Sequence, residues 1–228
     1  MKLAALCSGG KDSTFSIYKL REMGHDVVCL LTIIPQSENS MLFHFPSITV
    51  TSYLAQALQI PCSQFESADP SLEMEKRVLE YALDYAKSKY LIDGIVHGGI
   101  SSVFQKNAFE DVCNKQKLSV FSPIWGADSS IYMNELIESK FEIMITGVAC
   151  QGLDSKWLGR VLDHNAWRDL KEISSKYGIN LNFEGGEAET LVTDCPIYRK
   201  TLRIKRGISQ WFGDRGIFEI REVELTPK

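Results

Sequence analysis

Residues 2–13 read KLAALCSGGKDS, and this stretch decides which fold the chain can build. The apolar run Lys2–Leu6 has the length of a short buried strand, and residues 11–23 follow with apolar side chains at helical spacing. Gly9 and Gly10 stand between them, and glycine lets the backbone turn sharply and approach a ligand closely. Amides at the start of a helix favour an anion. The stretch therefore predicts a strand–loop–helix unit that binds phosphate.

The side chains of this loop support the same prediction. Lys11 adds a full positive charge, and Ser8 and Ser13 offer hydroxyl donors. Asp12 would repel phosphate unless it holds a magnesium ion or caps the helix. The loop lacks the Walker A spacing, and no G-x-G-x-x-G occurs in the chain. The alternative is a tight turn with a capping serine, which leaves the lysine unexplained.

Strand and helix patterns alternate after this unit. The expected strands are residues 27–34, 62–65 and 93–96, and the expected helices are 48–58, 70–89 (Asp69 as N-cap, Pro70 as first helical residue) and 102–115. Such alternation predicts βαβ units and an α/β fold with a doubly wound, mostly parallel sheet. Ligands of these sheets bind outside the carboxyl ends of the strands. We therefore expect the loops after Leu6, Ile34 and Val96 to share one edge.

The pattern changes near Pro123, where we place a domain boundary. Residues 1–122 would form the nucleotide-binding domain, and residues 123–228 a smaller α/β domain. The elements expected in the second domain are a helix over 129–138 and strands over 141–148, 197–206 and 216–225.

Composition limits the class of protein. The chain has 228 residues, 44% of them hydrophobic, which is enough for a real core. The formal net charge of -4 argues against general nucleic-acid binding. No apolar run is long enough to cross a bilayer. The six cysteines form no C-x-x-C pair and no zinc-ligand spacing, so we expect free thiols and a cytoplasmic location.

The loop Ser8–Ser13 resembles the PP-loop of the N-type ATP pyrophosphatases. Four further segments resemble one branch of them, the diphthine–ammonia ligases. The segments are Met41-Leu42-Phe43-His44; Gly98-Gly99-Ile100-Ser101 with Gln105, Glu110, Cys113 and Pro123-Ile124-Trp125; Gly152-Leu153 with Leu158-Gly159-Arg160; and Glu184-Gly185-Gly186-Glu187 with Glu189-Thr190-Leu191-Val192, Asp194 and Pro196. Three positions depart from the family, which usually has an aromatic residue at Ala188 and Arg at Lys106 and Asn107.

The resemblance implies a Rossmann-like fold of the adenine-nucleotide hydrolase type and a defined reaction. ATP, with Mg²⁺, would adenylate the free carboxylate of diphthine on translation elongation factor 2 and release pyrophosphate. Ammonia, taken as ammonium from solution, would then attack the acyl-adenylate and release AMP. Adenylation makes chemical sense because an ionised carboxylate has no adequate leaving group, and Lys11 would offset charge on the phosphates.

The resemblance also implies residue roles. It gives catalytic roles to Lys11, Asp12, Glu187 and Glu189; nucleotide binding to Ser8, Gly9, Gly10, Lys11, Asp12, Ser13, Gly98 and Gly99; substrate binding to His44, Gln105, Glu184, Gly186, Glu187 and Glu189; and the metal to Asp12. A homodimer is a further expectation.

Several alternatives stay open from the residues themselves. The glutamates would also suit a solvated acidic turn, His44 a structural role, and Lys106 with Glu110 a surface pair. The basic residues Arg199 to Arg206 suit a solvated strand face or a macromolecular docking surface. For the whole protein, the rivals are a PP-loop enzyme acting on tRNA or a small metabolite, and a nucleotide-binding protein without catalysis.

Overall fold

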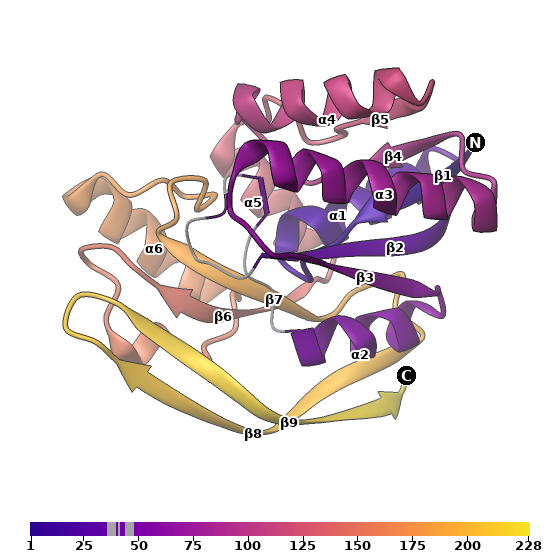
Figure 1. Cartoon of the computed structure of the whole chain (residues 1–228). Helices are drawn as coiled ribbons and strands as arrows, with labels where there is room; N and C mark the ends of the chain where they lie inside the picture. Colours follow the sequence, from indigo (N-terminus) through magenta and orange to yellow (C-terminus); the bar gives the residue numbers. More distant parts are fainter. Residues whose placement is uncertain (36–39, 41, 44–47) are drawn as a thin grey trace. The chain divides into compact units, whose positions relative to one another are not determined.

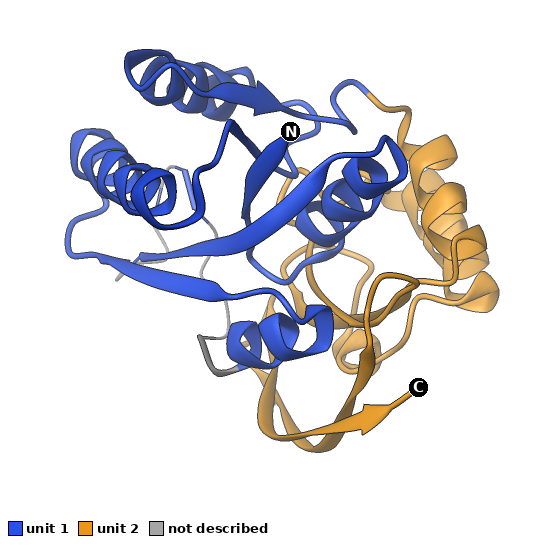
Figure 2. Cartoon of the chain, turned by 90° about the vertical axis from the view of Figure 1, so that its right-hand side faces the viewer, with its two compact units in different colours: residues 1–126 blue, residues 127–228 orange. Residues whose placement is uncertain are grey.

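The computed structural model describes residues 1–35, 40, 42, 43 and 48–228, apart from the side chains of residues 48 and 49. The chain forms two compact units, residues 1–126 and 127–228, shown in different colours in Figure 2. The division follows Gly126, whereas the expected boundary lay after residue 122.

The first unit is built on a five-stranded sheet (Figure 1). Its strands are β1 (Lys2–Leu6), β2 (Asp26–Pro35), β3 (Cys62–Ser67), β4 (Gly94–Val96) and β5 (Ser119–Phe121), and its helices are α1 (Lys11–Glu22), α2 (Ile48–Leu58), α3 (Leu72–Tyr90) and α4 (Val103–Lys115). All strand pairs are parallel, and the order is β3-β2-β1-β4-β5. The prediction of a doubly wound parallel sheet is confirmed. The strand order reverses between β1 and β4, which is the switch point where such sheets bind ligands.

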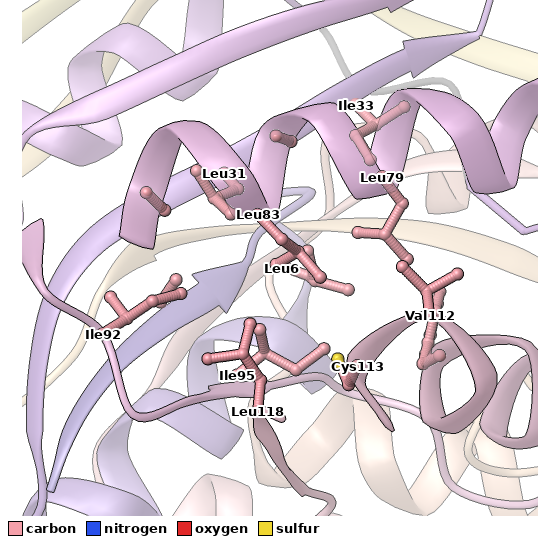
Figure 3. Packing of buried hydrophobic residues seen from close by; sticks show 14 of the residues in the cluster. Leu6, Leu31, Ile33, Leu79, Leu83, Ile92, Ile95, Val112, Cys113 and Leu118 are labelled. Carbon is pink, nitrogen blue, oxygen red and sulfur yellow. The ribbon is translucent and has the colours of Figure 1, made fainter. Parts of the chain in front are cut away.

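Apolar side chains cover both faces of this sheet. On one face, Leu6 of β1 and Leu31 of β2 pack with Leu79 and Leu83 of α3 and with Val112 of α4 (Figure 3). Helices α1 and α2 pack against β1, β2 and β3, and right-handed crossovers place them on the other face. Because β2 is buried on both sides, its sequence reads as a continuous apolar run.

The expected start of the third helix is wrong. Ser71, not Asp69, is the N-cap of α3, and the helix begins at Leu72. The Asp69 carboxylate accepts a hydrogen bond from the Ser71 amide at 2.6 Å, which closes a local turn just before the helix. This turn competes with helix formation, so the helix begins two residues later in the chain than expected.

The second unit has one antiparallel sheet, two α-helices and one short 3-10 helix. Its elements are α5 (Ser129–Glu138), β6 (Glu142–Val148), the 3-10 helix η1 (Ser155–Trp157), α6 (His164–Tyr177), β7 (Ala188–Asp194), β8 (Lys200–Trp211) and β9 (Gly216–Pro227). The strand order is β7-β6-β9-β8. The expected smaller α/β domain is therefore present. Strand β8 begins later and ends later than the expected 197–206, and α6 and β7 were not predicted.

Within the described part of the chain, none of the helices is both long and apolar enough to span a membrane.

Candidate nucleotide-binding site

The loop between β1 and α1 lies at the switch point of the sheet. Gly9 has a φ of 87°, in the left-handed region that favours glycine, and this conformation turns the chain out of β1. Gly10 is the N-cap of α1, so this helix, which is described over its whole length, begins without a side-chain cap. An anion placed at its start would meet backbone amides and the positive end of the helix dipole.

The two serines of the loop bind the peptide groups of Gly10. Ser8 Oγ accepts from the Gly10 amide at 3.4 Å, and Ser13 Oγ donates to the Gly10 carbonyl at 3.2 Å. The two hydroxyl oxygens are 3.4 Å apart. The two serines therefore stabilise the conformation of the loop, and Gly10 rather than a serine occupies the N-cap position.

Lys11 and Asp12 form an ion pair inside the loop. Lys11 Nζ lies 2.9 Å from each carboxylate oxygen of Asp12. The Lys11 side chain is 3% exposed and that of Asp12 is 30% exposed. A buried ammonium is stable only with a partner, and Asp12 supplies one. This explains why an acidic residue stands in a loop suited to anions.

Gly98, after β4, touches the backbone of the same loop. A Cβ atom at Gly98 would lie 2.5 Å from Ser13 N and 2.6 Å from Asp12 C. The end of β4 and the start of α1 are therefore in direct backbone contact, which accounts for a glycine at this position. Nucleotide binding by Gly98 and Gly99 stays a prediction.

His97 belongs to this site and was missed from the sequence. Its imidazole is buried, Nδ1 accepts from the Gly99 amide at 3.1 Å, and Nε2 lies 3.0 Å from Ser122 Oγ. Burial, followed by the charge of Lys106, lowers the pKa of His97 to about 4, so the ring is neutral at pH 7. The available signal was its place between an apolar strand and two glycines.

Gln105 holds the segment that follows β2. Its Nε2 donates to the Leu42 carbonyl at 3.1 Å, and the Leu42 amide donates to the buried carboxylate of Glu75 at 2.9 Å. Leu42 is thus held from both α3 and α4. His44, expected to bind substrate, lies outside the described residues.

Lys106 Nζ lies 3.9 Å from Glu110 Oε1, which fits the alternative that these two residues form an ion pair on the surface of the helix. The ammonium of Lys106 also lies 4.7 Å from the centre of the Trp125 ring, within range of a cation–π contact.

The glutamate segment of the second unit forms a closed loop before β7. Glu187 Oε1 accepts from the Asn180 amide and Oε2 from the Gly185 amide, both at 2.9 Å. Gly186 has a φ of 82°, and the Glu184 amide donates to Asn182 Oδ1 at 3.2 Å. The Glu187 carboxylate therefore organises this loop.

Glu189 is exposed on β7, opposite Gly147 of β6 in the sheet register. The structure thus places Lys11 and Asp12 in the first unit, and Glu187 and Glu189 in the second.

The described residues contain no cluster of three or more His, Cys, Asp or Glu side chains arranged for a metal ion. All six cysteines, each within the described part, are free thiols, as expected. Burial raises the pKa of Cys7, next to the phosphate loop, to about 11, so this thiol is not ionised at pH 7.

Known proteins match the chain along nearly its whole length. Residues 1–120 match the family model described as the diphthamide synthase N-terminal domain, and residues 128–225 match the diphthamide synthase C-terminal domain. The chain belongs to the diphthamide synthase family. The resemblance drawn from the sequence is confirmed.

Curated relatives agree with this assignment. The Diphthine–ammonia ligase of Homo sapiens is 31% identical over 220 residues, covering 89% of this chain and 82% of the human protein. That of Rattus norvegicus is 33% identical with the same coverage. That of Saccharomyces cerevisiae is 28% identical over 231 residues, covering 87% of this chain and 34% of the yeast protein. These names confirm the expected enzyme class, that of a ligase.

A solved structure, described as a predicted subunit of tRNA methyltransferase from Methanocaldococcus jannaschii, has a TM-score of 0.44 and 17% identity to the chain. That match covers 86% of this chain and 98% of the other.

Proposed function

We propose that this protein is a diphthine–ammonia ligase that uses ATP to convert the carboxylate of diphthine on translation elongation factor 2 into the amide of diphthamide. A carboxylate oxygen of diphthine attacks the α-phosphorus of ATP, and pyrophosphate leaves. Ammonia then attacks the acyl carbon, and AMP leaves. The observation that carries this proposal is the loop Ser8–Ser13, in which an uncapped helix start and a buried lysine lie at the switch point of the sheet.

The phosphate loop supplies binding and charge for the first step. Backbone amides at the start of α1 donate hydrogen bonds to the phosphate oxygens, and Lys11 offsets the negative charge that develops as pyrophosphate departs. Lys11 is buried and already paired with Asp12, so its ammonium is pre-positioned before ATP binds. Triphosphate oxygens would compete with the Asp12 carboxylate for this ammonium.

Asp12 fits the requirements of a magnesium ligand. Mg²⁺ is commonly held by one or two carboxylates together with substrate phosphates, and the Asp12 carboxylate is partly exposed within the phosphate loop. When bound, Mg²⁺ would neutralise part of the phosphate charge. Asp12 therefore has two roles in this proposal, to hold Lys11 and to bind the ion.

The glutamate loop is the proposed site for the cationic part of diphthine. Diphthine carries a trimethylammonium group, which carboxylates attract. Glu184, Gly186 and Glu189 would contact the substrate, and Glu187 would act by holding the loop through its two amide hydrogen bonds. Gln105 would act on the substrate side through the Leu42 segment that it holds.

The test is conversion of acid to amide on the protein substrate. The purified chain would be incubated with ATP, ammonium and elongation factor 2 carrying diphthine, and the modified peptide analysed by mass spectrometry alongside AMP and pyrophosphate release. We expect amide formation that requires ammonium. Absence of amide, with AMP and pyrophosphate formed instead on tRNA or a metabolite, would reject the assignment.

A pair of lysine variants sharpens this test. Lys11→Ala should reduce pyrophosphate release by a factor of about 100 or more, as expected when one charged group that stabilises the transition state is lost. Lys19→Ala changes a lysine in the last turn of the same helix, far from the loop, and should leave the rate unchanged. Equal rates in the two variants would remove Lys11 from the mechanism.

A further inference from the structure

His97 continues the sheet at the point where β4 meets the phosphate loop. Its amide donates to the Phe121 carbonyl of β5 at 3.1 Å, so its backbone is fixed at the carboxyl end of the strand. Its side chain is buried, and the proposed reaction does not use it. The imidazole packs edge-on against Phe109 of α4, with the ring centres 4.9 Å apart.

Both ring nitrogens of His97 are engaged, and their partners define the tautomer. Nδ1 accepts from the Gly99 amide, so the proton of the neutral ring is on Nε2. Nε2 then donates to Ser122 Oγ, which in turn donates to the Gly99 carbonyl at 3.5 Å. Gly99 is therefore held through its amide directly and through its carbonyl by way of Ser122.

The turn Gly98–Gly99 has close neighbours on both sides. A Cβ atom at Gly99 would lie 2.9 Å from His97 Nδ1, and one at Gly98 would lie 2.5 Å from Ser13 N. The imidazole is thus the close neighbour of the turn at Gly99, and the backbone of the phosphate loop is its close neighbour at Gly98. A shift of the turn has to be taken up by the loop.

We propose that His97 is a positioning residue of the nucleotide site, which fixes the Gly98–Gly99 turn against the phosphate loop and thereby sets the direction of the amides at the start of α1. This inference rests on the proposed binding of ATP by that loop. His97 touches no phosphate; it acts through Gly98, whose backbone contacts Asp12 and Ser13.

Three variants separate this role from simple packing. His97→Phe keeps an aromatic ring against Phe109 and removes both hydrogen bonds. His97→Asn supplies an oxygen near the position of Nδ1, which can accept from the Gly99 amide. Ser122→Ala removes only the partner of Nε2. The readouts are the Kd for ATP by calorimetry without acceptor substrate, the KM for ATP and kcat in the complete reaction, and the melting temperature.

We expect His97→Phe to weaken ATP binding by roughly ten-fold, the factor that corresponds to loss of the one buried hydrogen bond that holds the Gly99 amide directly. His97→Asn should recover most of this loss, and Ser122→Ala should weaken binding about three-fold. The KM for ATP should rise more than kcat falls.

A matched control tests whether destabilisation alone weakens ATP binding. Gly94 is the first residue of β4 and lies away from the phosphate loop. In Gly94→Ala, the new Cβ would lie 2.4 Å from the carbonyl oxygen of Ser119 in β5. This variant should melt earlier but bind ATP as the wild type does.

The outcomes are distinct. If His97→Phe and Ser122→Ala both bind ATP within two-fold of the wild type, the positioning role is overturned while the proposed function stands. If Gly94→Ala weakens ATP binding as much as His97→Phe, general destabilisation explains the effect and the inference is again overturned. If the wild type binds no ATP, both the inference and the proposed function fail.

Discussion

Replacing Gly98 by alanine should impair ATP binding more than it impairs folding. The added Cβ would lie 2.5 Å from Ser13 N and 2.6 Å from Asp12 C, whereas ordinary contacts begin at 3.4 Å. The loop must therefore retreat by about 0.9 Å, the difference between 3.4 and 2.5 Å. Because the neighbouring atoms belong to the backbone, no side-chain rotation relieves the contact.

The magnitude follows from the two consequences of this shift. Overpacking of this kind costs about 1–3 kcal/mol of folding stability. Hydrogen bonds to a charged group contribute about 1.5–3 kcal/mol each, so misdirecting one phosphate-binding amide should weaken ATP binding by roughly 10-fold to 150-fold. Gly98 is not among the glycines with positive φ, so alanine at this position has no backbone penalty to confuse the result.

The assay is calorimetric titration of ATP into Gly98→Ala and Gly94→Ala, with thermal melting of both. In Gly94→Ala, at the start of β4, the new Cβ would lie 2.4 Å from the backbone oxygen of Ser119. Its steric conflict with backbone is therefore as severe as that in Gly98→Ala. We expect both variants to melt earlier and only Gly98→Ala to lose ATP affinity. If Gly98→Ala binds ATP as tightly as Gly94→Ala, the backbone contact does not control the phosphate loop and the reasoning is refuted.

Three further predictions test single contacts. Asp12→Asn removes the ionised partner of the buried Lys11 ammonium, so it should lower the melting temperature, and saturating ATP should recover much of the loss because phosphate replaces the carboxylate; a deficit unchanged by ATP would contradict this. For His97, the folded pKa of about 4 lies below the ordinary 6.5, so the unfolded chain binds the proton first and stability should fall by up to about 3 kcal/mol as pH drops from 6.5 to 4. Urea unfolding at several pH values should show this fall in the free energy of unfolding, and the fall should be smaller in His97→Phe. Glu187→Gln replaces one of the two carboxylate oxygens that accept from backbone amides, so the KM for the protein substrate should rise while the Kd for ATP stays constant; Glu172→Gln, at an exposed position of α6, is the control.

Local patterns were sufficient for most elements of the first unit. Helix α2 has the bounds predicted for it, and the strand expected at residues 2–6 is β1. Strand β5 was missed because it is a short edge strand in which none of the three residues is fully buried. Helix α6 was missed because it is mostly polar, with Ala166, Trp167 and Leu170 as its buried residues. Strand β7 follows directly on a glycine-rich segment that has the composition of a turn.

The sequence predicted some site residues better than others, and the difference has a physical reason. The loop Ser8–Ser13 is contiguous, so its residue types alone define a site for phosphate. The partners of Gln105 and Glu187 were not predictable, because a polar side chain bonded to a backbone amide or carbonyl leaves no periodic pattern in the sequence. In both cases the side chain holds a loop, which residue type and spacing do not reveal.

The sequence by itself determined the phosphate loop, the alternation of strand and helix and the diphthamide synthase family, because each depends on neighbouring residues or on motifs in a fixed order. Only the tertiary structure decided that Gly98 packs on the backbone of Asp12 and Ser13, and that His97 is held neutral between Gly99 and Ser122. These contacts join segments that are far apart along the chain, and they form only when parallel strands bring their carboxyl ends to one edge of the sheet.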